Sequence, residues 1–247
     1  MSYGSFAHVY DRLTENVDYK SYAAYIKRLF ESYGKNISSV LDVACGTGSL
    51  TTELAKMGFD MIGTDASSDM LMEAQIKKYN ENLDILYLCQ KAEDLDLYGT
   101  VEGAVCTLDS INHITDEEDV LKAFKKVSLF MEKDGIFIFD MNTEYKHREI
   151  LGNNAFVYDL DDVYCVWQNE YDEENKITHI SLDIFCHEED DFYERYEEEF
   201  DERAYSLNQI ENWLKESNFE LLAYYKEMTE EMPQEDTQRI VYIARKK

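Results

Sequence analysis

Proline is almost absent from this sequence, which contains one in 247 residues. The chain also has no internal repeat, no low-complexity tract and no flexible linker. No segment approaches the ~18 consecutive apolar residues of a membrane-spanning helix, and the first residues lack the apolar core of a secretory signal. We therefore expect a cytoplasmic protein that folds as one large domain, or as a domain with an appended subdomain.

Signatures of metal and disulfide sites are also missing. The cysteines form no Cys-x-x-Cys pair, and the histidines form no His-x-x-x-His pattern. The apolar or glycine-rich surroundings of the cysteines predict buried free thiols in a reducing compartment, and no metal site can be identified. The five cysteines are Cys45, Cys89, Cys106, Cys165 and Cys186.

Positive charge is scarce. The chain has 24 lysines and arginines against 52 acidic residues, a formal net charge of −28. A surface this acidic repels phosphate backbones, which argues against a nucleic-acid substrate, and we expect no membrane partner. Solubility is the simplest explanation of the acidity.

What the sequence does contain is a glycine turn between an apolar strand and an amphipathic helix. Residues 40–48 read Val-Leu-Asp-Val-Ala-Cys-Gly-Thr-Gly, and the helical pattern begins at Ser49. This order opens a doubly wound nucleotide-binding fold, whose ligands bind at the carboxyl ends of the strands. Gly46 and Gly48 lack a Cβ, so the main chain can turn tightly there and approach a ligand.

The spacing around this turn excludes two common nucleotide motifs. A dinucleotide fingerprint requires glycine or alanine where this chain has Thr51, and a phosphate loop requires a lysine after the glycines. Asp42 precedes the turn, and Asp65 ends the next expected strand. Either residue alone would be interpreted as a turn or helix-capping residue. Together they favour a nucleoside site, because an acid at the second position can accept both ribose hydroxyls.

The segment Asp-x-Ala-Cys-Gly-Thr-Gly resembles the first motif of class I S-adenosylmethionine-dependent methyltransferases. The resemblance implies S-adenosylmethionine as the cofactor and S-adenosylhomocysteine as its product. In that family the amino-terminal segment covers the cofactor, an acid after the second strand binds the ribose, and an apolar residue meets the adenine. The residues that the resemblance assigns to the cofactor are Tyr10, Tyr19, Asp42, Ala44, Cys45, Gly46, Thr47, Gly48, Asp65, Ala66, Met70, Ala92 and Leu108.

Some of these assignments have a structural alternative. Met70, Tyr10 and Tyr19 would equally suit packing in the core. Lys91 departs from the family pattern, in which an acidic residue often bonds the adenine amino group at this position. The resemblance therefore leaves the backbone N–H of Ala92 as the expected adenine contact.

Strand and helix patterns alternate through the first 150 residues, which predicts a parallel, doubly wound α/β sheet. A last helix and two strands match the antiparallel hairpin that completes the seven-stranded Rossmann-like sheet of the methyltransferases. The first expected strand precedes the glycine turn. The others are Asp60–Thr64, Ile85–Cys89, Val101–Leu108, Ile136–Asp140, Phe219–Tyr225 and Ile240–Ala244. The expected helices are Tyr19–Ser32, Ser49–Met57, Asp69–Tyr79, Asp116–Met131 and Leu207–Ser217.

The composition changes over residues 151–203, where 18 residues are acidic and three are basic. Strand patterns at Ala155–Tyr158, Val163–Tyr171, Ile177–Cys186 and Phe192–Phe200, with a turn at Glu188–Asp191, predict a small inserted antiparallel subdomain. The cofactor-binding domain would then comprise residues 1–150 and 204–247. In enzymes of similar layout such an insert covers the active site, whereas a solvated sheet face would explain most of its carboxylates. The candidates for inward-pointing side chains are Arg195, Glu199, Glu202 and Arg203.

The resemblance implies methyl transfer from S-adenosylmethionine and leaves the acceptor open. The leading expectation is a small-molecule acceptor, an amine or another nitrogen or oxygen nucleophile, because the acidic insert would attract a cationic or amine acceptor. Asp109 and His113 follow the fourth expected strand and are the candidate catalytic residues, because each can accept a proton at the reacting end. A protein or RNA methyltransferase, which an open cleft or a basic rim would favour, and a non-catalytic S-adenosylmethionine-binding regulator, which a sealed cleft would favour, stay open. A Rossmann dehydrogenase is a more distant alternative, since the third glycine is missing.

Overall fold

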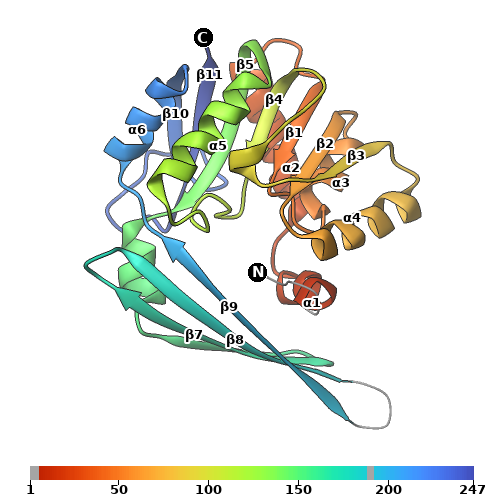
Figure 1. Ribbon diagram of the computed structural model, residues 1–247, viewed down its shortest axis with the longest axis vertical. Helices are drawn as coiled ribbons and strands as arrows, with labels where there is room; N and C mark the ends of the chain where they lie inside the picture. Colours follow the sequence, from red (N-terminus) through yellow and green to blue (C-terminus); the bar gives the residue numbers. More distant parts are fainter. Residues whose placement is uncertain (1–5, 188–191) are drawn as a thin grey trace.

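The computed structural model describes residues 6–187 and 192–247 as an α/β molecule with a large and a small sheet (Figure 1). The helices are α1 (Phe6–Leu13), α2 (Tyr19–Tyr33), α3 (Ser49–Lys56), α4 (Ser68–Glu81), α5 (Glu117–Leu129) and α6 (Leu207–Glu216), with short helical turns η1 (Ala92–Asp94) and η2 (Lys146–Leu151). The strands are β1 (Ser39–Val43), β2 (Asp60–Asp65), β3 (Ile85–Cys89), β4 (Val101–Cys106), β5 (Met131–Asn142), β6 (Ala155–Asp159), β7 (Val163–Asp172), β8 (Ile177–His187), β9 (Tyr193–Arg203), β10 (Phe219–Lys226) and β11 (Arg239–Lys246).

The large sheet has seven strands in the order β10-β11-β5-β4-β1-β2-β3. Strands β1 to β5 are parallel, and β11 runs antiparallel to both β5 and β10. After β3 the chain crosses to the other side of β1, so β1 and β4 lie at the topological switch point, where ligands bind in open α/β sheets. The predicted doubly wound, mostly parallel sheet is confirmed.

Apolar side chains of the large sheet alternate between two cores, one on each face. In β5, Phe137 and Phe139 share a core with residues of α5 and α6, whereas Ile136 and Ile138 share one with residues of α2 and α3. Because both faces are covered, residues 136–139 of β5 form a continuous apolar run in the sequence. The packed strands give the residues at their carboxyl ends fixed positions.

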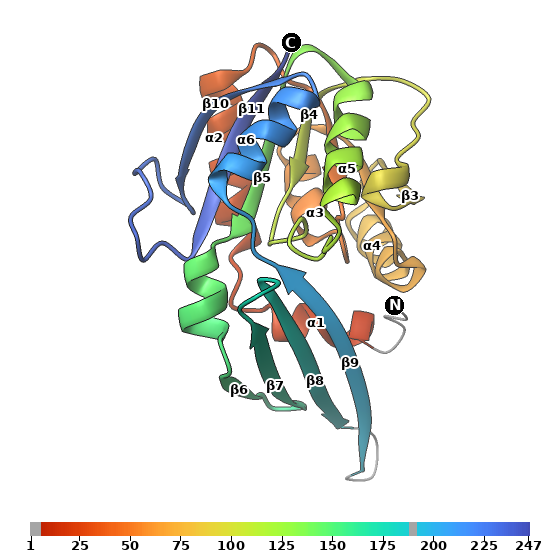
Figure 2. The same ribbon diagram turned by 60° about the vertical axis from the view of Figure 1, so that its left-hand side comes forward.

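The small sheet is antiparallel, in the order β6-β7-β8-β9. It lies beyond the edge at which the parallel strands of the large sheet end (Figure 1). Its buried face, which includes Ile180 and Leu182, packs with Val9 of α1 and Met70 of α4 in one apolar cluster. Helix α1 therefore lies between the small sheet and the α4 side of the large one (Figure 2).

Several element boundaries differ from the sequence expectation. Strand β4 ends at Cys106 rather than Leu108, because Leu108 and Asp109 adopt left-handed backbone conformations with φ of 56° and 55°. Strand β5 begins at Met131 rather than Ile136, with an irregular register against β4. Helix α1 has no counterpart among the helices expected from the sequence. The turn expected at Glu188–Asp191 lies outside the described residues.

Some burial expectations were also wrong. Cys89 is exposed and Cys45 is half-buried, although all five cysteines are free. Glu199 and Arg195 point outward, because β9 alternates and its inward positions include Glu198 and Glu202. Arg203 is half-buried and pairs with Glu117 at 2.9 Å. Within the described ranges, no helix combines the length and apolar character needed to cross a membrane.

Candidate functional site

A cavity of about 710 Å³ lies between the carboxyl ends of the parallel strands and the inner face of the small sheet. Its volume falls within the range of ligand and cofactor sites. Ala44, Asp65 and Leu108 line it from the ends of β1, β2 and β4, Tyr10 lines it from α1, and Glu202 lines it from β9. The cavity thus joins both sheets and the first helix.

Asp65 is the polar anchor of the glycine turn. One of its carboxylate oxygens accepts the N–H of Gly46 and the other accepts the N–H of Ser67, each at 2.8 Å. Burial raises the pKa of Asp65, although these hydrogen bonds act in the opposite direction. Each carboxylate oxygen has more than one lone pair. Asp65 can therefore hold the turn and still accept a hydroxyl from a ligand in the cavity.

The two glycines of the turn have different roles. Both adopt left-handed conformations, with φ of +54° at Gly46 and +71° at Gly48. A Cβ on Gly46 would meet no atom within 4 Å, so this backbone leaves room for a ligand. A Cβ on Gly48 would lie 2.5 Å from the Tyr87 hydroxyl oxygen and 2.9 Å from Ala74 Cβ. Gly48 therefore permits close packing against β3 and α4, which differs from the ligand approach expected of it.

Other residues of the motif lie behind the turn. Asp42 is buried and accepts the Thr51 hydroxyl at 2.6 Å, and its burial raises its pKa to about 7. Thr47 is also buried, and Cys45 packs against the core that α2 and α3 share. None of these three described side chains lines the cavity, nor does Gly48. We interpret them as residues that hold the shape of the turn.

The first helix is fastened to the turn by polar contacts. Asp11 accepts the Thr47 hydroxyl at 2.6 Å and pairs with Lys77 at 2.5 Å. Tyr10, on the same helix, lines the cavity, and burial raises its pKa. Tyr19 donates its hydroxyl to Thr14 at 3.2 Å and does not line the cavity, contrary to the expectation for it.

The turns after β2 and β3 form one wall of the cavity, in which small apolar residues alternate with polar ones. Ala66, Met70 and Ala92 line the cavity there, together with Lys91. Lys91 is exposed and pairs with Glu93 at 3.5 Å, so its charge is partly neutralised by a neighbour on the same turn. The positions expected to meet an adenine therefore share one wall of the cavity.

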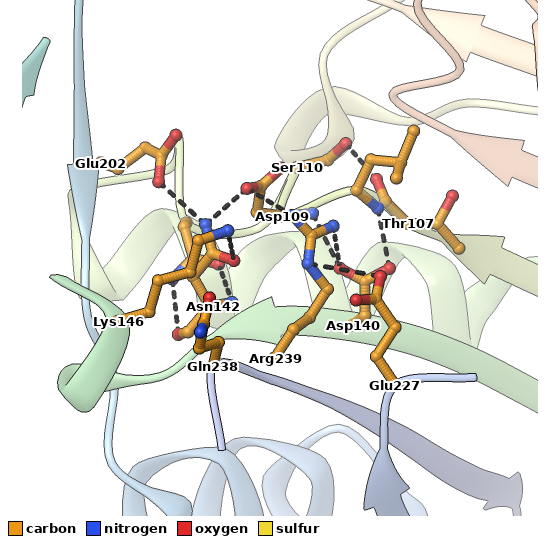
Figure 3. Close-up of polar contacts among 12 residues, drawn as sticks. Thr107, Asp109, Ser110, Asp140, Asn142, Lys146, Glu202, Glu227, Gln238 and Arg239 are labelled. Atoms are coloured by element: carbon orange, nitrogen blue, oxygen red, sulfur yellow. Dashed lines mark hydrogen bonds and ion pairs between the residues drawn. The ribbon is translucent and has the colours of Figure 1, made fainter. Parts of the chain in front are cut away.

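On the opposite wall, Asp140 holds the strained turn after β4. Its two carboxylate oxygens accept the N–H groups of Leu108 and Asp109 at 2.7 and 2.8 Å (Figure 3). Both residues are left-handed, a conformation that costs free energy for residues other than glycine unless the surroundings impose it. Tyr22 also donates its hydroxyl to Asp140, at 2.6 Å. The end of β5 thus imposes the conformation that brings Asp109 to the cavity.

Arg239 joins three carboxylates beneath this turn. It pairs with Asp109 at 2.9 Å, Asp140 at 3.2 Å and Glu227 at 3.5 Å (Figure 3). Burial alone would raise the pKa of Asp109, but the cations Arg239 and Lys146 lower it to about 2. Asp109 is therefore an ionised structural partner of Arg239, and this geometry makes it a weak proton acceptor.

His113 lies at the same end of the cavity, with its ring against Phe200 of the small sheet at a centroid distance of 5.0 Å. Its Nε2 is 3.7 Å from Oε1 of Glu202. The predicted pair Asp109 and His113 are thus together in the cavity, each with a different partner. Asn112, beside them, is buried and donates to the carbonyl of Arg203 at 2.8 Å, which ties this turn to β9.

Arg239 and Lys146 line the cavity and were not foreseen as functional. Arg239 stands 130 residues from Asp109 in the chain. In the sequence, Arg239 is recognisable only as a basic residue at the start of an apolar strand. This strand, β11, runs antiparallel to β5, which contains Asp140. Lys146 lines the cavity from η2, whose pattern is too short to identify in the sequence. The described ranges contain no group of three or more His, Cys, Asp or Glu side chains suited to a metal ion.

Comparisons with known proteins agree with this geometry. A family model described as a methyltransferase domain matches residues 40–135. The crystal structure of an S-adenosylmethionine-dependent methyltransferase from Clostridium acetobutylicum ATCC 824 has a TM-score of 0.90 and 34% identity, covering 99% of this chain and 98% of that one. A relative from Geobacillus sp. (strain WCH70) carries a methyltransferase name and is 29% identical over 248 residues, covering 100% of both chains. A glycine/sarcosine N-methyltransferase of Parasynechococcus marenigrum (strain WH8102) is 30% identical over 165 residues, 65% of this chain and 56% of that protein.

Proposed function

This chain belongs to the S-adenosylmethionine-dependent methyltransferases, and from that premise we propose that its acceptor is a nitrogen or oxygen nucleophile of a small molecule. The observation that carries the proposal is one continuous cavity that extends from the glycine turn to polar residues of the small sheet. When bound, S-adenosylmethionine supplies a methyl group that is activated by a positively charged sulfur. The chain itself has to align the nucleophile and exclude water, and alignment can supply roughly 7–11 kcal/mol in the best cases.

The cofactor half of this proposal rests on Asp65 and Gly46. Asp65 would accept the ribose hydroxyls, and the open backbone at Gly46 would lie against the ligand. Ala44 and Leu108 would border the methionine part, while Ala66, Met70 and Ala92 would hold the adenine. Small apolar residues beside a carboxylate that can accept hydroxyl groups fit the adenine and the ribose of an adenosyl group.

The acceptor half lies beneath the small sheet. We treat residues 151–203 as an acceptor-covering subdomain and residues 1–150 with 204–247 as the cofactor-binding domain. The cover over the cavity and the net charge of −28 favour a small molecule over RNA or a protein surface. The relative that is named for glycine and sarcosine, two small amines, is consistent with this choice.

His113 is the candidate general base, and Asp109 is assigned a positioning role. A general base contributes about 10²–10⁴-fold when the nucleophile starts protonated. The ion pair with Arg239 keeps Asp109 ionised and structurally engaged, whereas His113 keeps a ring nitrogen at the cavity. We therefore expect His113→Gln to lower turnover and leave cofactor binding unchanged.

Isothermal titration calorimetry tests the cofactor half of the proposal. S-Adenosylmethionine and S-adenosylhomocysteine should both bind, and the nicotinamide cofactors should not. A labelled-methyl screen of small-molecule extracts then tests the acceptor half, with a purified RNA and protein pool as the alternative acceptors. Label in the macromolecular pool alone would contradict the proposal, and full turnover of the His113→Gln variant would remove His113 from its role.

A further inference from the structure

Glu202 is a buried carboxylate that lines the cavity from β9. It is 4% exposed, and its Oε2 accepts the side-chain amide of Asn142 at 3.3 Å (Figure 3). That amide also donates to Asp109, and Lys146 donates to the Asn142 oxygen at 2.9 Å. Lys146 is thus engaged with Asn142, and among the described residues the ion-pair contacts of Glu202 are with histidines alone.

Two imidazoles face Glu202 at distances too long for a hydrogen bond. His113 Nε2 is 3.7 Å from Oε1, and His147 Nε2 is 3.8 Å from Oε2. Within the described structure, His113 Nδ1 and His147 Nε2 have no hydrogen-bond partner. Burial lowers the pKa of His147 to about 4, so this ring is neutral near pH 7 and does not supply a positive charge. A buried carboxylate without a contacting cation is costly unless a ligand completes it.

Aromatic rings of the small sheet line the same cavity. They are Tyr158, Trp167 and Phe200. Tyr158 and Trp167 stack on each other, with centroids 6.3 Å apart. Ammonium groups are attracted both to carboxylates and to the faces of aromatic rings. The insert therefore presents two features that recognise the same chemical group.

We propose that the acceptor is a small cationic amine, that Glu202 binds its ammonium group and accepts one of its protons, and that His113, whose Nε2 faces Glu202, then takes this proton from Glu202 and releases it to solvent. This inference rests on the proposed function of the same cavity. An N–H bond of the ammonium breaks and an O–H bond forms on Glu202, which frees the nitrogen lone pair. That pair then forms the N–CH₃ bond as the S–CH₃ bond breaks, and the sulfur keeps the electron pair of the broken bond. The product leaves as a methylated ammonium ion.

Burial favours this proton transfer through its effects on both the amine donor and the carboxylate acceptor. Removal from water lowers the pKa of an amine and raises that of a carboxyl group. Burial, with the nearby Asp109 charge, raises the pKa of Glu202, while His113 and Lys146 act in the opposite direction. His147, the remaining titratable group that faces Glu202, stays neutral. An exposed glutamate would hold the proton less readily.

Glu198 offers a matched control on the same strand. It is also inward-facing and 9% exposed, and burial raises its pKa, but it does not line the cavity. The test divides a bacterial small-molecule extract on a cation-exchange column at pH 7 into retained and unretained fractions. Each fraction is incubated with methyl-labelled S-adenosylmethionine and the wild type, Glu202→Gln, Glu202→Asp or Glu198→Gln. Binding of S-adenosylhomocysteine, measured by calorimetry, verifies that each variant is folded.

We expect label in the retained fraction, a loss of at least about 100-fold for Glu202→Gln, and partial recovery for Glu202→Asp, in line with the usual size of proton-transfer catalysis. Glu198→Gln should stay within about twofold of the wild type, because Glu198 does not reach the cavity. The activity of Glu202→Gln should also rise at higher pH than that of the wild type, since the amine must then lose its proton to solvent. A side chain with a merely structural role would lower activity without moving this pH dependence.

Label in the unretained fraction alone, or full activity of Glu202→Gln, would overturn the role of Glu202 and leave the methyltransferase proposal standing. No label in either fraction, with S-adenosylhomocysteine bound normally, would contradict the proposed small-molecule function itself. The two failures are therefore distinguishable.

Discussion

The two halves of the cavity are built in different ways. The cofactor half is centred on one stretch of chain, in which the turn after β1 and the acid at the end of β2 meet through hydrogen bonds to the backbone, and Tyr10, Ala92 and Leu108 complete it. The acceptor half combines the turn after β4, the helical turn η2, several residues of the small sheet and Arg239 of β11. Local backbone geometry fixes the shape of the cofactor half. The acceptor half depends on charged side chains that come together only after folding. This difference determines which substitutions damage the fold and which damage binding.

Removing Arg239 should have the largest effect, because it would leave the carboxylates of the acceptor half without their shared cation. We expect Arg239→Met to lower the free energy of unfolding by about 3–5 kcal/mol, the usual cost of breaking a buried ion pair. Arg245→Met is the matched control on the same strand, since Arg245 is more exposed and lies 4.0 Å from Glu220. That control should cost at most about 1 kcal/mol. If urea denaturation showed the same loss of unfolding free energy for Arg239→Met and Arg245→Met, the buried cluster would contribute no more to stability than a surface ion pair.

The cofactor half should be most sensitive at Gly48, which is limited by packing. Gly48→Ala adds a left-handed alanine, at about 1–2 kcal/mol, and a contact with Tyr87 that the structure has no room for. We expect a total loss of about 2–4 kcal/mol in thermal or urea unfolding. Gly58→Ala, at φ of +96° with nothing within 4 Å of the new Cβ, should show only the backbone cost. A Gly48→Ala variant no less stable than Gly58→Ala would contradict the packing role.

Asp65 should affect binding more than folding. Asp65→Ala removes the proposed ribose acceptor and should weaken S-adenosylmethionine binding by about 1–3 kcal/mol, the usual cost of losing hydrogen bonds to a charged group. Asp60→Ala, at the exposed start of the same strand, should leave the affinity unchanged. Calorimetry on both variants checks this, and an unaltered affinity for Asp65→Ala would place the ribose elsewhere.

The smallest effect is the contribution of Asp109 to acid stability. Its pKa of about 2 in the folded protein is below the usual value of about 3.9, so the unfolded chain binds the proton more readily. The stabilisation is therefore fully present above about pH 4 and is lost as the pH falls toward 2. Between pH 5 and 2.5 we expect a loss on the order of 1.5 kcal/mol from this group. Urea titrations at both pH values should show a smaller drop for Asp109→Asn, and an equal drop would remove Asp109 as its source.

The fold can be predicted from the sequence because the signals for its strands, turns and helices are local. Apolar runs, glycine turns and capping residues such as Ser67 repeat at fixed spacings, and the strands and helices follow them. The pairing of Asp65 with Gly46 was accessible for the same reason, since both belong to one strand–turn–helix–strand unit. The packing requirement at Gly48 was not visible, because a glycine required by packing and one required by a ligand look the same in a sequence.

The acceptor half was only partly accessible. Asp109 and His113 were expected at the cavity because they follow β4, yet the ion pair of Asp109 depends on Arg239, from β11. Glu202 was one of several inward candidates in the insert, and only the alternation of β9 separates it from Glu199. A single-residue shift in the β9 pattern would have reversed that choice. A single sequence does not show which residues of distant elements will contact each other in the fold.

The most direct measurement is a crystal structure of the protein with S-adenosylhomocysteine. The account predicts the ribose hydroxyls within hydrogen-bonding distance of the Asp65 carboxylate, backbone at Gly46 against the ligand, and the sulfur facing the end of the cavity that Glu202 lines. A ligand bound away from Asp65, with the Gly46 turn unoccupied, would contradict it.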